Sequence, residues 1–195
     1  MRIFQLFLIL FFTFNSLYAF EKEASIVKLD NSNFCKIYKH WILKFHLNIT
    51  DESPEGGEGS KIFLKKRTPK NSPGDCKSLN TSLAIDASEM SFLGISNDYV
   101  FLRRYKSAPG FTRLSVYSTE TSNLVRKIVV TVDRPIEAKE KKLIFWESKK
   151  RLKGDACRDL KEKSELGCEE IQKIEMDINT GKKHFIGHKE LIPVF

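Results

Sequence analysis

The chain has 195 residues, a formal net charge of +8 at pH 7 and 41% hydrophobic residues. This length suits one domain or two small ones. The apolar share is too high for a disordered chain and too low for a polytopic helical membrane protein, and four cysteines are too few for a small disulfide-dense scaffold.

Residues 1–19, MRIFQLFLILFFTFNSLYA, predict a signal peptide. An early arginine precedes an apolar run from Ile3 to Phe14, and Leu17-Tyr18-Ala19 forms a small-residue cleavage site before Phe20. The run of about a dozen residues is shorter than the roughly 20 that span a bilayer. An uncleaved anchor is the alternative, whereas a lipoprotein is disfavoured because no cysteine lies near the cleavage point.

The rest of the chain, residues 20–195, is basic. One of the 33 basic residues and none of the 25 acidic residues lie in the first 19, so the remainder carries a net charge of +7. No apolar run in it exceeds about five residues, and nothing in it predicts a transmembrane helix. We therefore expect a single exported β-rich domain, periplasmic or secreted.

All four cysteines lie in this exported part: Cys35, Cys76, Cys157 and Cys168. An even number of cysteines in an exported chain predicts disulfides. Of the three possible pairings we favour Cys35–Cys76 with Cys157–Cys168, because the second pair closes a short polar loop.

The alternative for Cys157 and Cys168 is a zinc site completed by His184 and His188. However, ten residues separate the two cysteines, where structural zinc sites usually have two to four, and export favours oxidation. The acids of residues 51–58 also lack the alternating ligand pattern of a calcium loop. We predict no metal and no cofactor.

The clearest strand signal runs from Cys35 to Thr50. The odd positions are apolar apart from Lys39, and the even positions are mostly polar. This period of two predicts one long strand with one apolar face. Because Cys35 shares that face with Leu43 and Phe45, we expect its disulfide in the core.

Further segments rich in Val, Ile, Tyr and Phe, separated by Asn, Gly, Ser and Pro, predict more strands. The charged stretch Ala156–Leu166 predicts one short surface helix. The fold class is therefore mainly β, with antiparallel sheets of sandwich-like or propeller-blade-like hairpins, at most one short helix and two disulfides. The expected strands are Lys61–Arg67, Ser91–Ile95, Tyr99–Tyr105, Thr112–Ser118, Leu124–Val132, Lys141–Trp146, Ile171–Ile178 and His184–Ile186.

A weak internal repeat relates residues 98–128 to residues 142–187. Val100-Phe101 aligns with Ile144-Phe145 at an offset of 44, and Thr121 aligns with Thr180 at an offset of 59. The sequence of residues 177–182, DINTGK, resembles the hairpin turn of β-propeller blades. Two ordinary antiparallel hairpins are the alternative interpretation.

The sequence contains no nucleophile elbow, no H-E-x-x-H, no S-x-x-K with its partner motifs and no glycine-rich phosphate loop. Acids such as Asp86, Glu89, Asp98 and Glu120 have no spacing that singles out a pair for glycoside hydrolysis. We predict no catalytic residue. A periplasmic or secreted hydrolase, or a hydrolase inhibitor, with a site built from residues distant in sequence stays as the alternative.

Basic residues gather in clusters that attract polyanions. Export argues against nucleic acid as the partner, and no nucleic-acid recognition motif is present. The leading hypothesis is an exported, non-catalytic binding protein that acts on an anionic envelope component or an acidic protein. The alternative is that these side chains only keep strand edges soluble. The candidate anion-binding residues are Lys65, Lys66, Arg67, Arg103, Arg104, Lys149, Lys150 and Arg151.

A small outer-membrane barrel is a further alternative. The C-terminal residues Leu191–Phe195 resemble the closing strand of such barrels, although Pro193 departs from that pattern. Lysine and arginine on both faces of the other strands argue against it, because a lipid-facing basic residue costs about 2–4 kcal/mol near the bilayer midplane.

Overall fold

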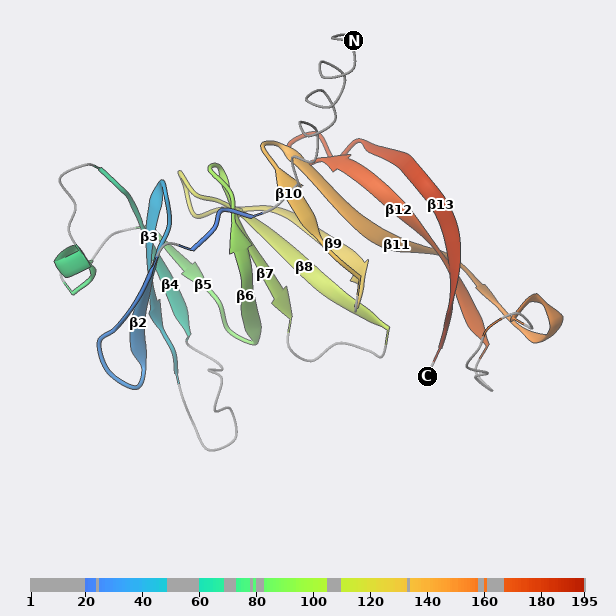
Figure 1. Cartoon of the computed structure of the whole chain (residues 1–195), viewed down its shortest axis with the longest axis horizontal. Helices are drawn as coiled ribbons and strands as arrows, with labels where there is room; N and C mark the ends of the chain where they lie inside the picture. Colours follow the sequence, from blue (N-terminus) through green and yellow to red (C-terminus); the bar gives the residue numbers. More distant parts are fainter. Residues whose placement is uncertain are drawn as a thin grey trace, which may run out of the picture.

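A computed structural model of the chain describes residues 20–23, 25–48, 60–68, 73–77, 79, 83–104, 110–132, 134–157, 160 and 167–194. The predicted signal peptide, residues 1–19, lies outside the described residues. The described chain folds into three antiparallel sheets that follow one another along the sequence and stand side by side (Figure 1). It contains no α-helix, which confirms the prediction of a mainly β protein.

The first sheet has five strands, and each strand pairs antiparallel with the next one along the chain. A short 3-10 turn, η1 (Pro73–Cys76), lies between the last two. The strands are β1 (Ser25–Lys28), β2 (Asn33–Ile37), β3 (Trp41–His46), β4 (Lys61–Lys66) and β5 (Ala84–Asp86).

The second and third sheets have four strands each, again in chain order and antiparallel. A 3-10 turn, η2 (Gly154–Cys157), follows the second strand of the third sheet. The second sheet comprises β6 (Met90–Ile95), β7 (Tyr99–Arg104), β8 (Phe111–Ser118) and β9 (Leu124–Thr131). The third comprises β10 (Glu137–Lys139), β11 (Lys142–Leu152), β12 (Cys168–Asp177) and β13 (Lys183–Pro193).

Most of the predicted strands agree with observed ones to within a few residues. Three observed strands, β1, β5 and β10, have no predicted counterpart. They have three or four residues each and are too short to show an alternating pattern. β11 and β13 continue well beyond their predicted ends, through charged residues. The predicted helix over Ala156–Leu166 falls mostly outside the described residues, and its first two residues end the 3-10 turn η2.

The prediction of one long strand from Cys35 is wrong, because the chain reverses at Lys39 and His40 to form the hairpin of β2 and β3. Tyr38 and Trp41 flank this two-residue turn, and the Tyr38 N–H donates to the Trp41 carbonyl at 2.8 Å. Paired residues of a hairpin share a face, so an even position and an odd position now lie on the same side. The alternation therefore changes phase at the turn.

This change of phase corrects the expected place of Cys35. It lies opposite Lys44 and shares the outer face of the first sheet with Ile42, whereas Leu43 and Phe45 face the second sheet. Cys35 is fully buried, but in a small apolar cluster of its own.

Two larger cores hold the three sheets together, and β7 contributes to both. Its alternate side chains point in opposite directions, as in any strand. Val100 and Leu102 belong to the first core, between the first and second sheets, while Tyr99 and Phe101 belong to the second core, between the second and third. The buried partners in the first core are Tyr38, Trp41, Leu43, Phe45, Ile62, Leu64, Ile85, Ala87 and Ile95. Those in the second are Leu114, Val116, Ile128, Val130, Ala138, Leu143, Phe145, Ile174, Met176 and Ile178.

Polar atoms at the turns connect the same sheets. The Trp41 indole N–H donates to the Asn97 carbonyl of the β6–β7 turn at 2.9 Å. The Tyr99 hydroxyl bonds to the Asn179 side-chain carbonyl of the β12–β13 turn at 2.5 Å. Each aromatic residue thus buries its ring in a core and satisfies its polar atom on the next sheet.

The two end sheets each have an outer face that no further sheet of the described residues covers, and each face is closed differently. On the first sheet, the segment with η1 lies over Ile42 and is fastened by the Cys35–Cys76 disulfide, with Leu79 buried beside it. On the third sheet, ion pairs lie across the face that buries Ile144, Trp146 and Ile171. These pairs are Lys142–Glu175, Lys173–Glu137 and Arg134–Glu190.

The second and third sheets have turns of the same kind before their last strands. The Ser118 hydroxyl accepts the Thr121 N–H at 3.3 Å, and the Asp177 carboxylate accepts the Thr180 N–H at 2.7 Å. These partners are separated by the predicted offset of 59. In the preceding strands the offset is 43 rather than 44, because Tyr99 lies opposite Ser118 and Lys142 opposite Asp177.

Both disulfides have the favoured pairing, Cys35–Cys76 and Cys157–Cys168. The sequence separations are 41 and 11 residues, so loop-closure entropy gives about 4 and about 3 kcal/mol respectively. The zinc alternative is wrong for Cys157 and Cys168, because both sulfurs are used in the bond.

The difference between the two disulfides can be tested by replacing each pair with alanine. We expect Cys35→Ala/Cys76→Ala to lose more unfolding free energy than Cys157→Ala/Cys168→Ala, by about 1 kcal/mol from loop length and by more from the loosened cover of the first sheet. Urea denaturation monitored by circular dichroism measures both variants. A larger loss for the second pair would contradict this order.

The packing of Phe20 on β6 gives a second prediction. Its ring lies 5.1 Å from that of Phe101, and a Cβ added at Gly94 would come within 2.8 Å of both Phe20 Cδ atoms. Gly94→Ala should therefore cost about 1–3 kcal/mol by overpacking. The double variant with Phe20→Ala should recover most of that cost, and additive losses in denaturation would contradict the contact.

Candidate functional site

The predicted anion-binding residues lie on three different sheets. Lys65, Lys66 and Arg67 are at the end of β4, next to the β2–β3 turn, because the Arg67 N–H donates to the His40 carbonyl at 2.7 Å. Arg103 and Arg104 are at the end of β7, about 17 Å along that strand from the β6–β7 turn.

The third group is on β11 and faces acids on its neighbour. Lys150 lies opposite Glu170 in the register, and Arg151 lies opposite Glu169. Lys149 forms an ion pair of 3.6 Å with Glu147. The basic residues of this group therefore lie among acids, although the Glu170 carboxylate also pairs with Lys189 at 2.8 Å.

Two arginines of the other groups also have structural partners. Arg104 pairs with Glu89 at 2.7 Å, and Arg67 donates to the Tyr38 carbonyl at 3.1 Å. The structure does not bring the predicted residues together into one site. Anion binding by them stays a prediction about a dispersed basic surface.

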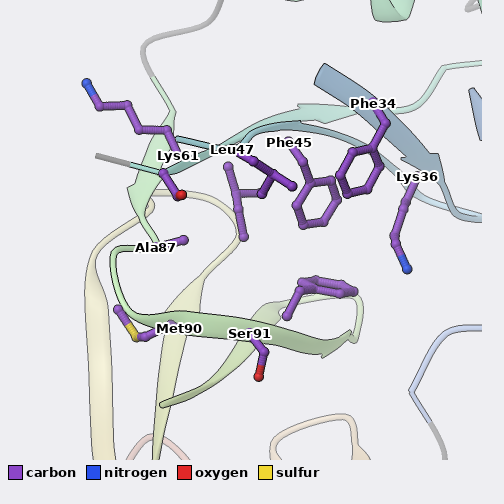
Figure 2. Close-up of a pocket in the computed structure, with 11 residues that line it drawn as sticks. Phe34, Lys36, Phe45, Leu47, Lys61, Ala87, Met90 and Ser91 are labelled. Carbon is purple, nitrogen blue, oxygen red and sulfur yellow. The ribbon is translucent and has the colours of Figure 1, made fainter. Parts of the chain in front are cut away.

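The structure contains instead a groove that the sequence analysis did not predict. It lies between the first sheet and β6, with a volume of about 290 Å³ (Figure 2). One wall comes from β2, β3 and β4, and the other comes from β6 and the residues that precede it. The lining residues are Phe34, Lys36, Phe45, Leu47, Ser60, Lys61, Ile62, Ala87, Met90, Ser91 and Phe92.

One end of the groove is aromatic. The rings of Phe34 and Phe45 stack with centroids 4.7 Å apart, and Phe92 meets Phe45 edge-on at 5.2 Å. The other end is aliphatic, with Leu47 and Met90 in its walls (Figure 2). The first core thus opens to solvent along this groove.

Two lysines border the groove, but only one lies on its face of the sheet. Lys36 is opposite Leu43, on the inner face, and its ammonium is 5.6 Å from the centroid of the Phe92 ring. Lys61 is opposite His46 and Asp86, on the outer face. No acid stands among the described residues that line the groove.

The N-terminal segment, residues 20–23, joins the two sheets and reaches the border of the groove through Glu23. The Glu21 N–H donates to the Ile95 carbonyl at 2.7 Å, and its carboxylate lies 2.7 Å from Nδ1 of His40 on the β2–β3 turn. Glu23 forms an ion pair of 2.9 Å with Lys36. The ammonium of Lys36, at the border of the groove, is therefore already paired with the carboxylate of Glu23.

The titratable groups with shifted pKa values support the turns and the cores rather than a catalytic centre. Hydrogen bonds from Ser88 lower the pKa of Asp86, and hydrogen bonds from Thr180 lower that of Asp177. Burial raises the pKa of Tyr38, Tyr99 and Tyr117. A general acid or base works best with a pKa near neutrality, and these shifts run in the opposite direction.

No cluster of three or more potential metal ligands occurs among the described residues. Within the same residues, no helix is long and apolar enough to cross a membrane. No protein-family model matches the chain, and the comparison with curated proteins finds no matching sequence. The candidate site therefore depends on geometry alone.

The sequence did contain a partial signal of the groove. Phe34, Lys36 and Tyr38 alternate with the outer-face residues of β2, so this strand has large side chains on both faces. That pattern indicates burial on both sides. The prediction of one long strand with a single apolar face missed this second buried face of β2.

The turn carboxylate Asp177 gives a pH-dependent prediction. Its folded pKa lies below the ordinary value of 3.8, so its stabilisation is present above pH 3.8 and is lost as the pH falls through the folded pKa. The stability difference between the protein and Asp177→Ala should stay constant from neutral pH to about pH 4 and shrink below it. Denaturation at a series of pH values measures this difference.

Ser118→Ala is the matched control, because Ser118 accepts the corresponding hydrogen bonds without a titrating group. Its stability difference should not change with pH over that range. A parallel pH dependence in both variants would show that the effect does not come from the Asp177 carboxylate.

Proposed function

We propose that this is an exported, non-catalytic binding protein that recognises an anionic component of the cell envelope. The observation that carries the proposal is the groove between the first sheet and β6, which combines apolar walls with the ammonium of Lys36. Ligand sites are typically concave and apolar with a few placed polar groups.

The dispersed basic surface supports the same function in a different way. Lys66 and Arg67 are exposed at one end of the first sheet, and the chain from residue 20 carries a net charge of +7. A basic residue near an anionic membrane surface contributes about 1 kcal/mol to attraction. This surface would draw the protein to the envelope, while the groove would select the ligand.

Export is part of the proposal. The predicted signal peptide directs the chain out of the cytoplasm, and the two disulfides are consistent with an oxidising compartment. Both support a location in the periplasm or outside the cell.

The proposal is tested with vesicles of a zwitterionic lipid alone and vesicles that also contain an anionic lipid. The protein, residues 20–195 with both disulfides formed, should sediment only with the anionic vesicles. Binding should weaken strongly at 1 M salt, because the screening length falls from about 10 Å at 0.1 M to about 3 Å. Equal binding to both kinds of vesicle, or none to either, would refute the proposal.

Two matched variants separate the groove from the general charge. Lys36→Gln and Lys61→Gln each remove one positive charge beside the groove, but only Lys36 lies on its face. We expect Lys36→Gln to reduce vesicle binding more than Lys61→Gln. Equal losses would mean that the whole basic surface binds and that the groove has no part in it.

A further inference from the structure

We infer that the groove binds a single unbranched acyl chain with an anionic head group, and that Glu23 competes with this head group for Lys36. The inference rests on the proposed function, since it names the ligand class of the same site. Three observations carry it: the size of the groove, the order in which residues line its walls, and the ion pair at its border.

The size of the groove selects a small apolar group. A dry cavity of about 150 Å³ holds a benzene molecule, which has six non-hydrogen atoms. The groove has about twice that volume, 290 Å³, and therefore accepts on the order of a dozen non-hydrogen atoms. A saturated chain of about ten carbons has this size, whereas a two-chain lipid could insert only part of one chain.

The order of the walls selects an extended chain. Leu47, Phe45 and Phe34 follow one another along the upper wall in Figure 2, and Met90 lies across from them at the aliphatic end. The groove is open on one side, so a flexible chain can lie along it without the backbone opening. Each methylene buried in this way strengthens binding about fourfold.

The direction of the chain follows from the two lysines. Lys36 lies at the aromatic end and on the groove face, while Lys61 is on the opposite face of the sheet. The anionic head therefore lies at the aromatic end, beside Lys36 and the ring of Phe92, and the tail points toward Leu47 and Met90.

Glu23 stands where this head group would bind. Its carboxylate is 2.9 Å from the Lys36 ammonium, and the two side chains are 29% and 27% exposed. A ligand carboxylate must replace it to form the same ion pair. Because Glu23 belongs to the segment that joins the first and second sheets, ligand binding is coupled to the release of that segment at this one contact.

The ligand class is tested by calorimetry with decanoate below its micelle-forming concentration. Decanoate should bind with one-to-one stoichiometry, acetate should not bind, and the uncharged decyl glucoside should bind about tenfold more weakly. The tenfold factor corresponds to about 1.4 kcal/mol for one charge-assisted contact. Equal affinity for decanoate and decyl glucoside would overturn the assignment of an anionic head.

The competition is tested with two conservative variants. Glu23→Gln should raise the affinity for decanoate about threefold, because it removes the competing carboxylate from a partly exposed pair. Glu137→Gln removes an ion pair of 3.6 Å with Lys173 in the third sheet and should leave the affinity unchanged. An unchanged or lower affinity in Glu23→Gln would overturn the competition.

The location is tested by filling the groove. Met90→Trp and Leu47→Trp each enlarge a half-buried lining residue and should reduce decanoate affinity at least tenfold, and either one suffices if the other does not fold. Leu124→Trp, at an exposed apolar position on β9, is the matched control and should bind normally. Normal binding by a folded groove variant would overturn the site.

These outcomes separate the two proposals. Binding to anionic vesicles without any binding of decanoate would remove the acyl-chain inference and leave the proposed function standing. If the protein binds neither decanoate nor anionic vesicles, both are refuted.

Discussion

A sheet with two apolar faces must be covered on both sides, and this constraint organises the whole molecule. The second sheet has such faces: Val100 and Leu102 point one way, and Phe101 points the other. It therefore needs a sheet on each side, and the first and third sheets supply them. Each of these sheets then has its own outer face to close. The Cys35–Cys76 disulfide with its covering segment closes one, and a set of ion pairs over Trp146 closes the other.

The candidate site is a consequence of the same arrangement. Where the first and second sheets pack fully, as at Leu64 and Leu102, their side chains are inaccessible to solvent. Toward Phe34 and Phe92 the sheets cover each other less completely, and the half-buried aromatic rings line an open groove. The segment of Phe20 and Glu21 bridges the two sheets, because Glu21 bonds both to Ile95 on β6 and to His40 on the β2–β3 turn. The residues that pack the first and second sheets together thus also line the proposed binding groove, so the proposed ligand would bind where these two sheets meet.

Much of the fold could be predicted because its signals are local. Short alternating stretches located most of the longer strands, and the shared β8–β9 and β12–β13 turn geometry follows from Ser118 and Asp177, each of which bonds within a few residues of itself. The hairpin at Lys39 and His40 could not be predicted from alternation alone, because apolar residues continue at odd positions through the turn. The outer-face role of Cys35 and the inner-face role of Lys36 both depend on that reversal.

The sequence by itself determined the β class, the favoured disulfide pairing and the positive charge, since these depend on composition, local periodicity and cysteine spacing. Only the tertiary structure decided which charges meet. It placed Lys150 and Arg151 opposite acids on β12, and it separated Lys66 from Arg104 by putting them on different sheets. It also brought Lys36 to Phe92, 56 positions later in the chain, and thereby created the groove. The physical reason is that strand pairing and sheet stacking join distant residues, and no local pattern encodes such contacts.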